Sequence, residues 1–259
     1  SYSIMNQSRK YPRVSYGATI HGKEEINAVV NVLKTSTQMG RNVELFEKKI
    51  AKLFDKKYGL MTNSGTSALY LAMECIDIPK GSEIITPCLT FGTTVASMVR
   101  NGFIPSFVDV KIDTFCIDER QIESQINKNT KAILAPDLLG NICDWRVIKR
   151  IARKYKLKIL HDSADALGSK LHNKNTGYFS DLSITSFYGS HIINGAGNGG
   201  IILTSNQKIY NRMKVLRSWG RSSSLLKDGE SIKERFNVKL DGITYDKKFI
   251  FEEMGYQLE

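Results

Sequence analysis

The feature that most constrains the fold is a regular alternation of short apolar segments with longer amphipathic ones across residues 58–216. Short strands separated by helices predict an α/β fold, a mostly parallel sheet with helices on both faces. The predicted strands cover residues 58–61, 83–86, 104–108, 131–136, 157–161, 183–187 and 200–204. The predicted helices cover residues 23–35, 43–53, 90–100, 145–155 and 208–216, with one more running through Leu69 and Met73.

In such a sheet, functional residues gather in the loops beyond the carboxyl ends of the strands. The alternation therefore directs attention to five loops, which are residues 63–67, 87–91, 137–141, 162–168 and 188–200.

Composition limits the partners. The 259 residues, 41% of them hydrophobic, can bury a full core, and 37 Lys and Arg against 26 Asp and Glu give a net charge of +11. The basic residues look scattered, without an arginine-rich helix, so we expect an anionic small molecule such as a diphosphate rather than a nucleic acid. No apolar stretch is long enough for a membrane helix and residues 1–16 lack a secretory signal, so we expect a cytoplasmic protein that does not bind membranes.

The four cysteines show neither a CxxC pair nor metal-ligand spacing. We therefore expect no metal site and no disulfide, and we interpret Cys75, Cys88, Cys116 and Cys143 as small buried residues.

Two loops carry polar groups suited to a ligand. Asn63-Ser64-Gly65-Thr66-Ser67-Ala68 leaves a strand and opens a helix, so its amides and hydroxyls could bind a phosphate or could simply cap the helix. Asp162 follows an apolar strand, where a carboxylate could be a metal ligand, a base, a helix cap, or the partner of a pyridinium nitrogen.

A third loop combines a histidine with glycines. His191 follows a predicted strand and precedes Gly195, Gly197, Gly199 and Gly200, which permit close approach of the backbone to a ligand. A lone histidine is more often structural than catalytic, so position alone does not decide its role.

Taken in order, these motifs resemble the fold-type-I nucleotide-sugar aminotransferase family, also called the DegT family. The resemblance covers residues from about 35 to the end of the chain. It rests on residues 63–68, Thr86-Pro87 with Thr90-Phe91, Phe107-Val108-Asp109, the Asp162 segment, Ser186-Phe187 and Gly199-Gly200.

The resemblance implies a cofactor, pyridoxal 5'-phosphate (PLP) or pyridoxamine 5'-phosphate (PMP), and a role for each matched residue. Gly65, Thr66, Ser67 and Ser186 would lie at the cofactor phosphate. Phe91 would stack on the pyridine ring and Ala164 would pack on its other face. Asp162 would pair with the ring nitrogen, and Asp165 would lie next to the ring hydroxyl.

The departure from the family is His191. Its aminotransferases carry the Schiff-base lysine at this position, five residues after the serine that matches Ser186, and no lysine lies between Lys174 and Lys208. Histidine cannot form an imine with pyridoxal. One branch of the family does carry this histidine, the PMP-dependent 3-dehydratases of nucleotide-linked 4-keto-6-deoxyhexoses. Residues 138–141, 165–169 and 219–221 are also similar to that branch, in which the histidine is the catalytic residue.

The resemblance leaves three functions open. The first is such a dehydratase in deoxysugar and surface-polysaccharide biosynthesis. The second is a nucleotide-sugar aminotransferase with an altered lysine, and the third is a non-catalytic relative that binds sugar nucleotides. Loss of the family's lysine and glutamate, the latter replaced in Gly197-Asn198-Gly199-Gly200 after an apparent one-residue insertion, favours the third.

Further expectations concern the assembly and the ends of the chain. Some dehydratases hold an iron–sulfur cluster through cysteines after Trp-Gly-Arg; Ser222-Ser223-Ser224 stands there, so we expect no cluster. We expect an N-terminal segment (1–35), a cofactor-binding large domain (36–240), and the start of a largely missing C-terminal small domain (241–259). The resemblance implies a homodimer with the active site at the interface; a reductase is a further candidate partner.

Overall fold

Seven strands form one sheet in the order β1-β9-β8-β5-β4-β2-β3, in a computed structural model that describes residues 12, 14–15, 17, 20–37, 39–226 and 231–259. Six strands run parallel and β9 runs against its neighbours β1 and β8, as expected for a mostly parallel sheet. The strands are β1 (Tyr58–Thr62), β2 (Glu83–Pro87), β3 (Ile104–Val108), β4 (Thr130–Pro136), β5 (Lys158–Asp162), β8 (Leu182–Ser186) and β9 (Gly200–Thr204).

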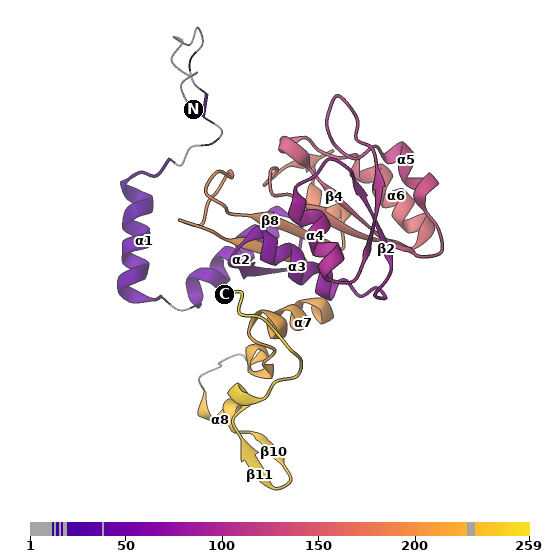
Figure 1. The fold of residues 1–259 in the computed structure, drawn as a ribbon. Helices are drawn as coiled ribbons and strands as arrows, with labels where there is room; N and C mark the ends of the chain where they lie inside the picture. Colours follow the sequence, from indigo (N-terminus) through magenta and orange to yellow (C-terminus); the bar gives the residue numbers. More distant parts are fainter. Residues whose placement is uncertain (1–11, 13, 16, 18–19, 38, 227–230) are drawn as a thin grey trace, which may run out of the picture.

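Helices cover both faces of the sheet (Figure 1). On one face α3 (Gly65–Cys75), α4 (Gly92–Arg100) and α7 (Gln207–Arg217) bury a common core, and on the other α5 (Glu119–Gln125) and α6 (Trp145–Tyr155) bury a second one. A smaller cluster joins α2 (Arg41–Leu53) to β9. Successive side chains of β4 point to opposite faces of the sheet, so Ala132 and Leu134 pack in the first core while Ile133 and Ala135 pack in the second.

The element boundaries agree with the expected ones to within two residues. The fourth helix begins at Gly92 rather than residue 90, because Phe91 has extended backbone angles (φ −69°, ψ 140°). The alternation missed α5, whose seven residues bury only Ile122 and so show no helical period. It also missed two short hairpins and the four-residue helix α8 (Ile232–Arg235). The hairpins are β6 (Lys170–Leu171) with β7 (Lys174–Asn175), and β10 (Val238–Leu240) with β11 (Ile243–Tyr245).

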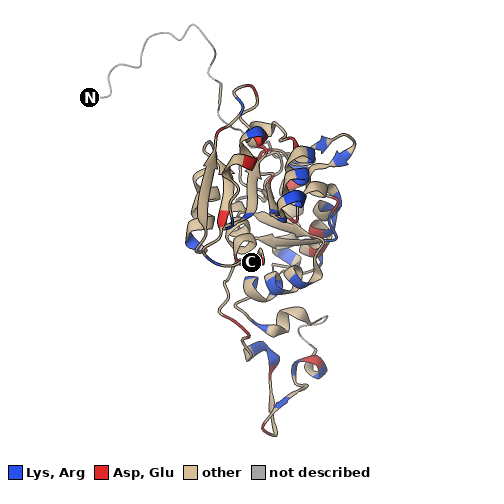
Figure 2. Cartoon of the chain, turned by 90° about the vertical axis from the view of Figure 1, so that its right-hand side faces the viewer, with Lys and Arg blue, Asp and Glu red and all other residues tan. Residues whose placement is uncertain are grey.

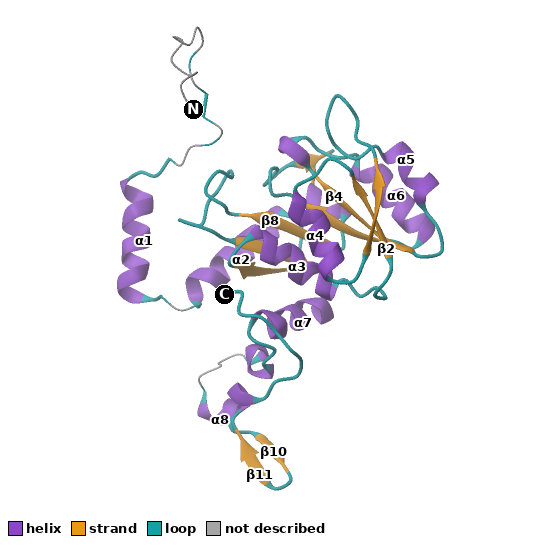
Figure 3. Ribbon diagram, in the orientation of Figure 1, coloured by secondary structure: helices purple, strands orange, loops and turns teal. Residues whose placement is uncertain are grey.

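Both ends of the described chain leave the sheet layers (Figure 3). The helix α1 (Lys23–Thr35) forms as predicted but has no buried residue, and its apolar stripe Ile26, Val29, Val30 and Leu33 is exposed. At the other end, α8 and the β10–β11 hairpin project from the α7 side before the chain returns. There the Leu258 carbonyl accepts a hydrogen bond from the Asn63 amide at 2.8 Å.

Two predictions are wrong, one about the burial of Cys88 and one about the distribution of the basic residues. Cys88 is exposed, whereas Cys75, Cys116 and Cys143 are buried as expected. The basic residues are not scattered everywhere, since α6 carries five Lys and Arg among eleven residues and no acidic one (Figure 2).

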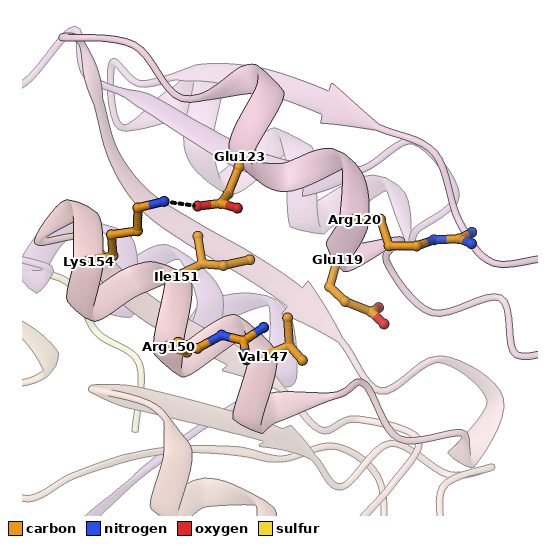
Figure 4. Close-up of a pocket in the computed structure, with 7 residues that line it drawn as sticks. All are labelled: Glu119, Arg120, Glu123, Val147, Arg150, Ile151 and Lys154. Carbon is orange, nitrogen blue, oxygen red and sulfur yellow. Dashed lines mark hydrogen bonds and ion pairs between the residues drawn. The ribbon is translucent and has the colours of Figure 1, made fainter.

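A hollow of about 540 Å³ lies between α5 and α6, lined by Glu119, Arg120, Glu123, Val147, Arg150, Ile151 and Lys154 (Figure 4). It contains none of the predicted site residues. Its facing charges pair with each other, because Lys154 Nζ lies 2.7 Å from Glu123 Oε1. The hollow is therefore a surface crevice apart from the predicted site.

A buried ion pair joins α7 and α2 to β1, the outermost strand on one side of the sheet. Arg217 of α7 donates through Nη1 to Glu47 Oε1 of α2 at 3.1 Å and to the Met61 carbonyl of β1 at 3.0 Å. Glu47 Oε1 also accepts from the Met61 amide at 2.8 Å. Glu47 and Arg217 are both less than 10% exposed, so each neutralises a charge that would be costly to bury alone.

We expect Glu47→Ala to lower the free energy of unfolding by about 3 kcal/mol, because it leaves the Arg217 guanidinium buried without its carboxylate. Urea unfolding at neutral pH measures the difference. Glu44→Ala, an exposed glutamate on the same helix, is the matched control and should change stability little. Equal effects of the two substitutions would contradict this account of the pair.

Candidate functional site

The five loops singled out from the sequence lie at one edge of the sheet. The strands β1, β2, β4, β5 and β8 run in the same direction, and each of these loops directly follows the carboxyl end of one of them. The antiparallel strand β9 starts at this same edge, so the glycine loop runs along it and returns at Gly200. The fold therefore confirms that these five loops gather at the carboxyl ends of the parallel strands.

The start of α3 lies directly against Ser186, the last residue of β8. A Cβ atom on Gly65 would lie 2.7 Å from the Ser186 Cβ, a distance that real side chains do not tolerate. Ser64 Oγ accepts from the Ser67 amide at 3.0 Å, so the expected helix cap is present. The structure thus brings Gly65, Thr66, Ser67 and Ser186 together in one cradle.

Capping leaves amide groups free for a ligand. The Ser67 amide binds Ser64 Oγ and the Ala68 amide binds the Ser64 carbonyl at 3.0 Å. Among the described residues, the amides of Gly65 and Thr66 have no hydrogen-bond partner, as expected for the first turn of a helix. Free amides at a helix N-terminus suit an anion such as a phosphate. The Ser67 hydroxyl itself donates to Asn63 Oδ1 at 2.6 Å, which fixes the loop.

Asp162 ends β5 in a buried position. Its Oδ1 accepts from the Ala164 amide at 3.0 Å, which makes a turn, so the helix-cap interpretation of this residue is wrong. Burial raises the pKa of the Asp162 carboxyl to about 6, against the weaker opposing effects of that amide and of His161. A buried carboxyl without an ion-pair partner among the described residues fits a ligand that brings its own positive charge.

Asp165 connects two loops of the edge. Its Oδ2 accepts from the Leu139 amide at 3.0 Å, and its Oδ1 lies 3.8 Å from His191 Nε2. Leu139 has a left-handed backbone (φ 56°), which turns its amide toward the carboxylate. His191 Nδ1 is buried without a hydrogen-bond partner in the described structure. The imidazole is thus held near one carboxylate, with its second nitrogen buried and unpaired among the described residues.

The remaining predicted residues are Phe91 and Ala164, which lie in the loops after β2 and β5. Phe91 is 70% exposed at the start of α4, and Ala164 is half-buried beside Asp162. Three buried hydroxyls nearby in the sequence, on Thr86, Thr90 and Ser163, have no partner among the described residues. The cofactor roles of Phe91 and Ala164 stay predictions.

The sequence did not predict a buried contact between His161 and Asp137. His161 of β5 contacts Asp137, the residue that follows β4, at 2.8 Å between Nε2 and Oδ2. The feature of the sequence that could have indicated this contact is His161 itself, a polar residue that follows Ile159 and Leu160 and directly precedes Asp162. Within the described residues, no group of three or more His, Cys, Asp or Glu side chains could hold a metal ion.

Residues 19–244 match the DegT/DnrJ/EryC1/StrS aminotransferase family. The chain belongs to this family. Among curated relatives, it is 32% identical to dTDP-4-dehydro-2,6-dideoxy-D-glucose 3-dehydratase of Saccharopolyspora spinosa over 254 residues, which is 94% of this chain and 55% of that protein.

Solved structures of the family share the fold. A GDP-4-keto-6-deoxy-D-mannose-3-dehydratase of E. coli with bound hydrated PLP has a TM-score of 0.83 at 29% identity, covering 93% of this chain and 62% of that one. PseC of Helicobacter pylori, an aminotransferase in pseudoaminic acid biosynthesis, has a TM-score of 0.81 at 29% identity, covering 94% and 61%. The fold is therefore that of the fold-type-I PLP-dependent enzymes. The chain spans about half the length of the curated relatives it matches.

Within the described part of the chain, no helix has the length and apolar character needed to cross a bilayer.

In the protein without cofactor, the buried Asp162 carboxyl should make the free energy of unfolding depend on pH. Its folded pKa of about 6 exceeds the unfolded value near 3.9, so the folded state binds more protons between these two pH values. Stability is therefore lost as the pH rises from about 4 to about 6. We expect Asp162→Asn to raise the free energy of unfolding at pH 8 by about 3 kcal/mol, and to change it much less at pH 4.

Urea unfolding of the cofactor-free protein at both pH values measures this effect. Asp77→Asn, at an exposed turn, is the control and should give the same small change at both. A gain from Asp162→Asn that is equal at pH 4 and pH 8 would show that ionisation of this carboxyl is not the cause.

Proposed function

We propose that this chain is the cofactor-binding part of a PLP/PMP-dependent 3-dehydratase that acts on a nucleotide-linked 4-keto-6-deoxyhexose in deoxysugar and surface-polysaccharide biosynthesis. The observation that carries the proposal is His191, which follows β8 where aminotransferases of the family carry their lysine and lies 3.8 Å from Asp165. Both the Saccharopolyspora relative and the E. coli structure are named as 3-dehydratases.

The geometry of the sheet edge fits the cofactor. Gly65, Thr66 and Ser186 offer amides and a hydroxyl at one point for its phosphate. Asp162 supplies a buried carboxylate for the protonated ring nitrogen, which would remove the cost of its isolation. The bound cofactor supplies an electron sink for the reaction, and an acidic partner at its ring nitrogen maintains that property.

His191 provides proton transfer in this arrangement. Imidazole can both donate and accept a proton, and the two nitrogens of His191 differ here: Nε2 faces Asp165, while Nδ1 is buried without a partner among the described residues. Loss of a hydroxyl group requires a proton on the departing oxygen, and His191 can carry one to it. Asp165, anchored by the Leu139 amide, holds the imidazole in place.

A nucleotide-sugar aminotransferase is the second candidate. The family includes enzymes of both kinds, and PseC matches this fold as well as the dehydratase does. Against it stands the absence of lysine between Lys174 and Lys208, which leaves this loop unable to form an imine. A non-catalytic relative that binds sugar nucleotides is the third candidate, and retention of cofactor by the protein would argue against it.

The partners that we propose follow from the reaction. The substrate is a nucleoside diphosphate sugar, whose charge suits the net +11 of the chain. The exposed apolar stripe of α1 supports burial against a second copy in a homodimer. A cytoplasmic location, a reductase partner and the absence of an iron–sulfur cluster stay predictions.

We expect His191→Ala to lower the rate of keto-sugar dehydration at least about 100-fold, the usual contribution of a positioned acid–base group, while leaving PMP affinity within a few-fold. The assay uses the whole protein and 4-keto-6-deoxyhexoses linked to CDP, GDP or dTDP. His172→Asn, at the exposed turn of the β6–β7 hairpin, is the control and should keep full activity. Unchanged dehydration in His191→Ala would remove the proposed role of this residue.

Borohydride treatment separates the candidate functions. After incubation with PLP, the dehydratase should show bound cofactor but no covalent adduct by intact mass. A single adduct on one lysine would favour the aminotransferase instead. Failure to bind either form of the cofactor would favour the non-catalytic relative.

A further inference from the structure

The loop that carries His191 is closed at its base by a backbone hydrogen bond. The Gly195 amide donates to the Phe187 carbonyl at 2.8 Å, so the residues between them form a closed loop that contains His191. This loop, between β8 and β9, extends from the sheet toward the α1 end of the molecule (Figure 1). Ile192 is 65% exposed and Ile193 is 42% exposed, so these apolar side chains do not anchor the loop in a core. Contacts with other segments therefore influence where His191 lies.

A segment near the start of the chain contacts this loop on both sides of His191. His21 Nε2 lies 3.0 Å from Asn194 Oδ1, although 173 positions separate the two residues in sequence. Gly17 lies so close to Ser190 that a Cβ atom on the glycine would be 2.7 Å from the Ser190 Cβ. The segment thus reaches the residue directly before His191 and a residue shortly after it.

The hydrogen bond between these segments runs from His21 to Asn194. Asn194 Oδ1 also accepts from the Ala196 amide at 3.1 Å, which identifies this atom as the carboxamide oxygen. The oxygen can only accept, so His21 Nε2 donates. One neutral tautomer of imidazole carries this proton, so the contact does not require a charged His21. Because Ala196 has a left-handed backbone (φ 56°), the same carboxamide ties a turn of the loop to the segment.

The position of His21 is set by the start of α1. His21 directly precedes Gly22, the N-cap of that helix, and Glu25 Oε2 accepts from the Gly22 amide at 2.7 Å. A glutamate that reaches back from the first turn in this way fixes the entry of the chain into the helix. The helix buries no residue, so the segment is not drawn to the loop by packing in a core.

The side chain of His191 is held only weakly within the site. Its Nε2 lies 3.8 Å from Asp165 Oδ1, which is longer than a hydrogen bond, and its Nδ1 has no hydrogen-bond partner among the described residues. A displacement of about 1 Å at a reacting group can lower a rate about 100-fold. The placement of His191 for proton transfer therefore depends strongly on the position of its loop.

We propose that His21 is a positioning residue, which holds the loop of His191 against the segment before α1 through its hydrogen bond to Asn194. The inference rests on the catalytic role of His191 in the proposed function. His21 touches neither cofactor nor substrate in this arrangement. Gly17 supports the contact, because its lack of a side chain lets the segment lie against Ser190.

Substitution of His21 in the whole protein tests this role. His21→Ala removes the donor, so we expect kcat for keto-sugar dehydration to fall about 5-fold, the effect of one hydrogen bond lost from the positioned loop, while KM stays within about 2-fold. His21→Gln keeps an N–H donor, and we expect it to restore kcat to within about 2-fold of the original. Ile20→Ala, at a neighbouring side chain that is 90% exposed, is the control and should change neither constant.

A double-mutant cycle tests whether His21 acts through Asn194. In the Asn194→Ala background the acceptor is already absent, so we expect His21→Ala to lower kcat no further. An equal 5-fold loss in both backgrounds would overturn the inference. So would a His21→Gln variant that is as slow as His21→Ala.

Hydrogen exchange in the cofactor-free protein provides a measurement that does not depend on activity. We expect His21→Ala to increase exchange at the amides of Gly195 and Ala196 about 5-fold, because the loop opens more often, and His21→Gln to leave it unchanged. Equal exchange in all three proteins would contradict the inference. If His191→Ala leaves dehydration unchanged, the proposed function fails, and the exchange rates still decide whether His21 holds the loop.

Discussion

The site depends on the close contact of two glycines with neighbouring strands. Gly65 lies against Ser186, and Gly200 lies so close to the Ser64 carbonyl that a Cβ atom would be 2.2 Å from that oxygen. These contacts bring the start of α3 against the ends of β8 and β9. They place the free amides of one loop beside the hydroxyl of another, although more than a hundred residues separate them in sequence. Any side chain at either position would move the helix away from the sheet edge.

Much of the architecture was accessible from sequence because each strand is an apolar segment that ends at a polar loop. Asp162 and His191 were found in this way, each as a polar residue just past a strand. Family resemblance then implied roles that position alone left open, and these roles stay predictions. The charged surface of α6 was missed because its basic residues are interleaved with Ile148, Ile151 and Ala152, which face the core. Helical spacing distributes them along the sequence but gathers them on one side in space.

Contacts between loops could not be predicted. The left-handed turn at Leu139 and its hydrogen bond to Asp165 depend on how two strands end side by side. The same holds for Asp137 and His161, which are 24 residues apart in sequence and meet because β4 and β5 are neighbours. Polar pairs inside a core are set by strand register, which a single sequence specifies only weakly when both faces of the sheet are buried.

The isolated carboxyl of Asp162 has a consequence for the life of the protein in a cell. Because its charge is unfavourable while it is unpaired, a cationic cofactor bound at Asp162 in the proposed way would stabilise the folded chain by mass action. The folded fraction would then follow the concentration of the cofactor relative to its dissociation constant. Molecules made when that ligand is scarce would unfold more often and be exposed to proteases, so nutritional supply would influence the abundance of the protein as well as its rate.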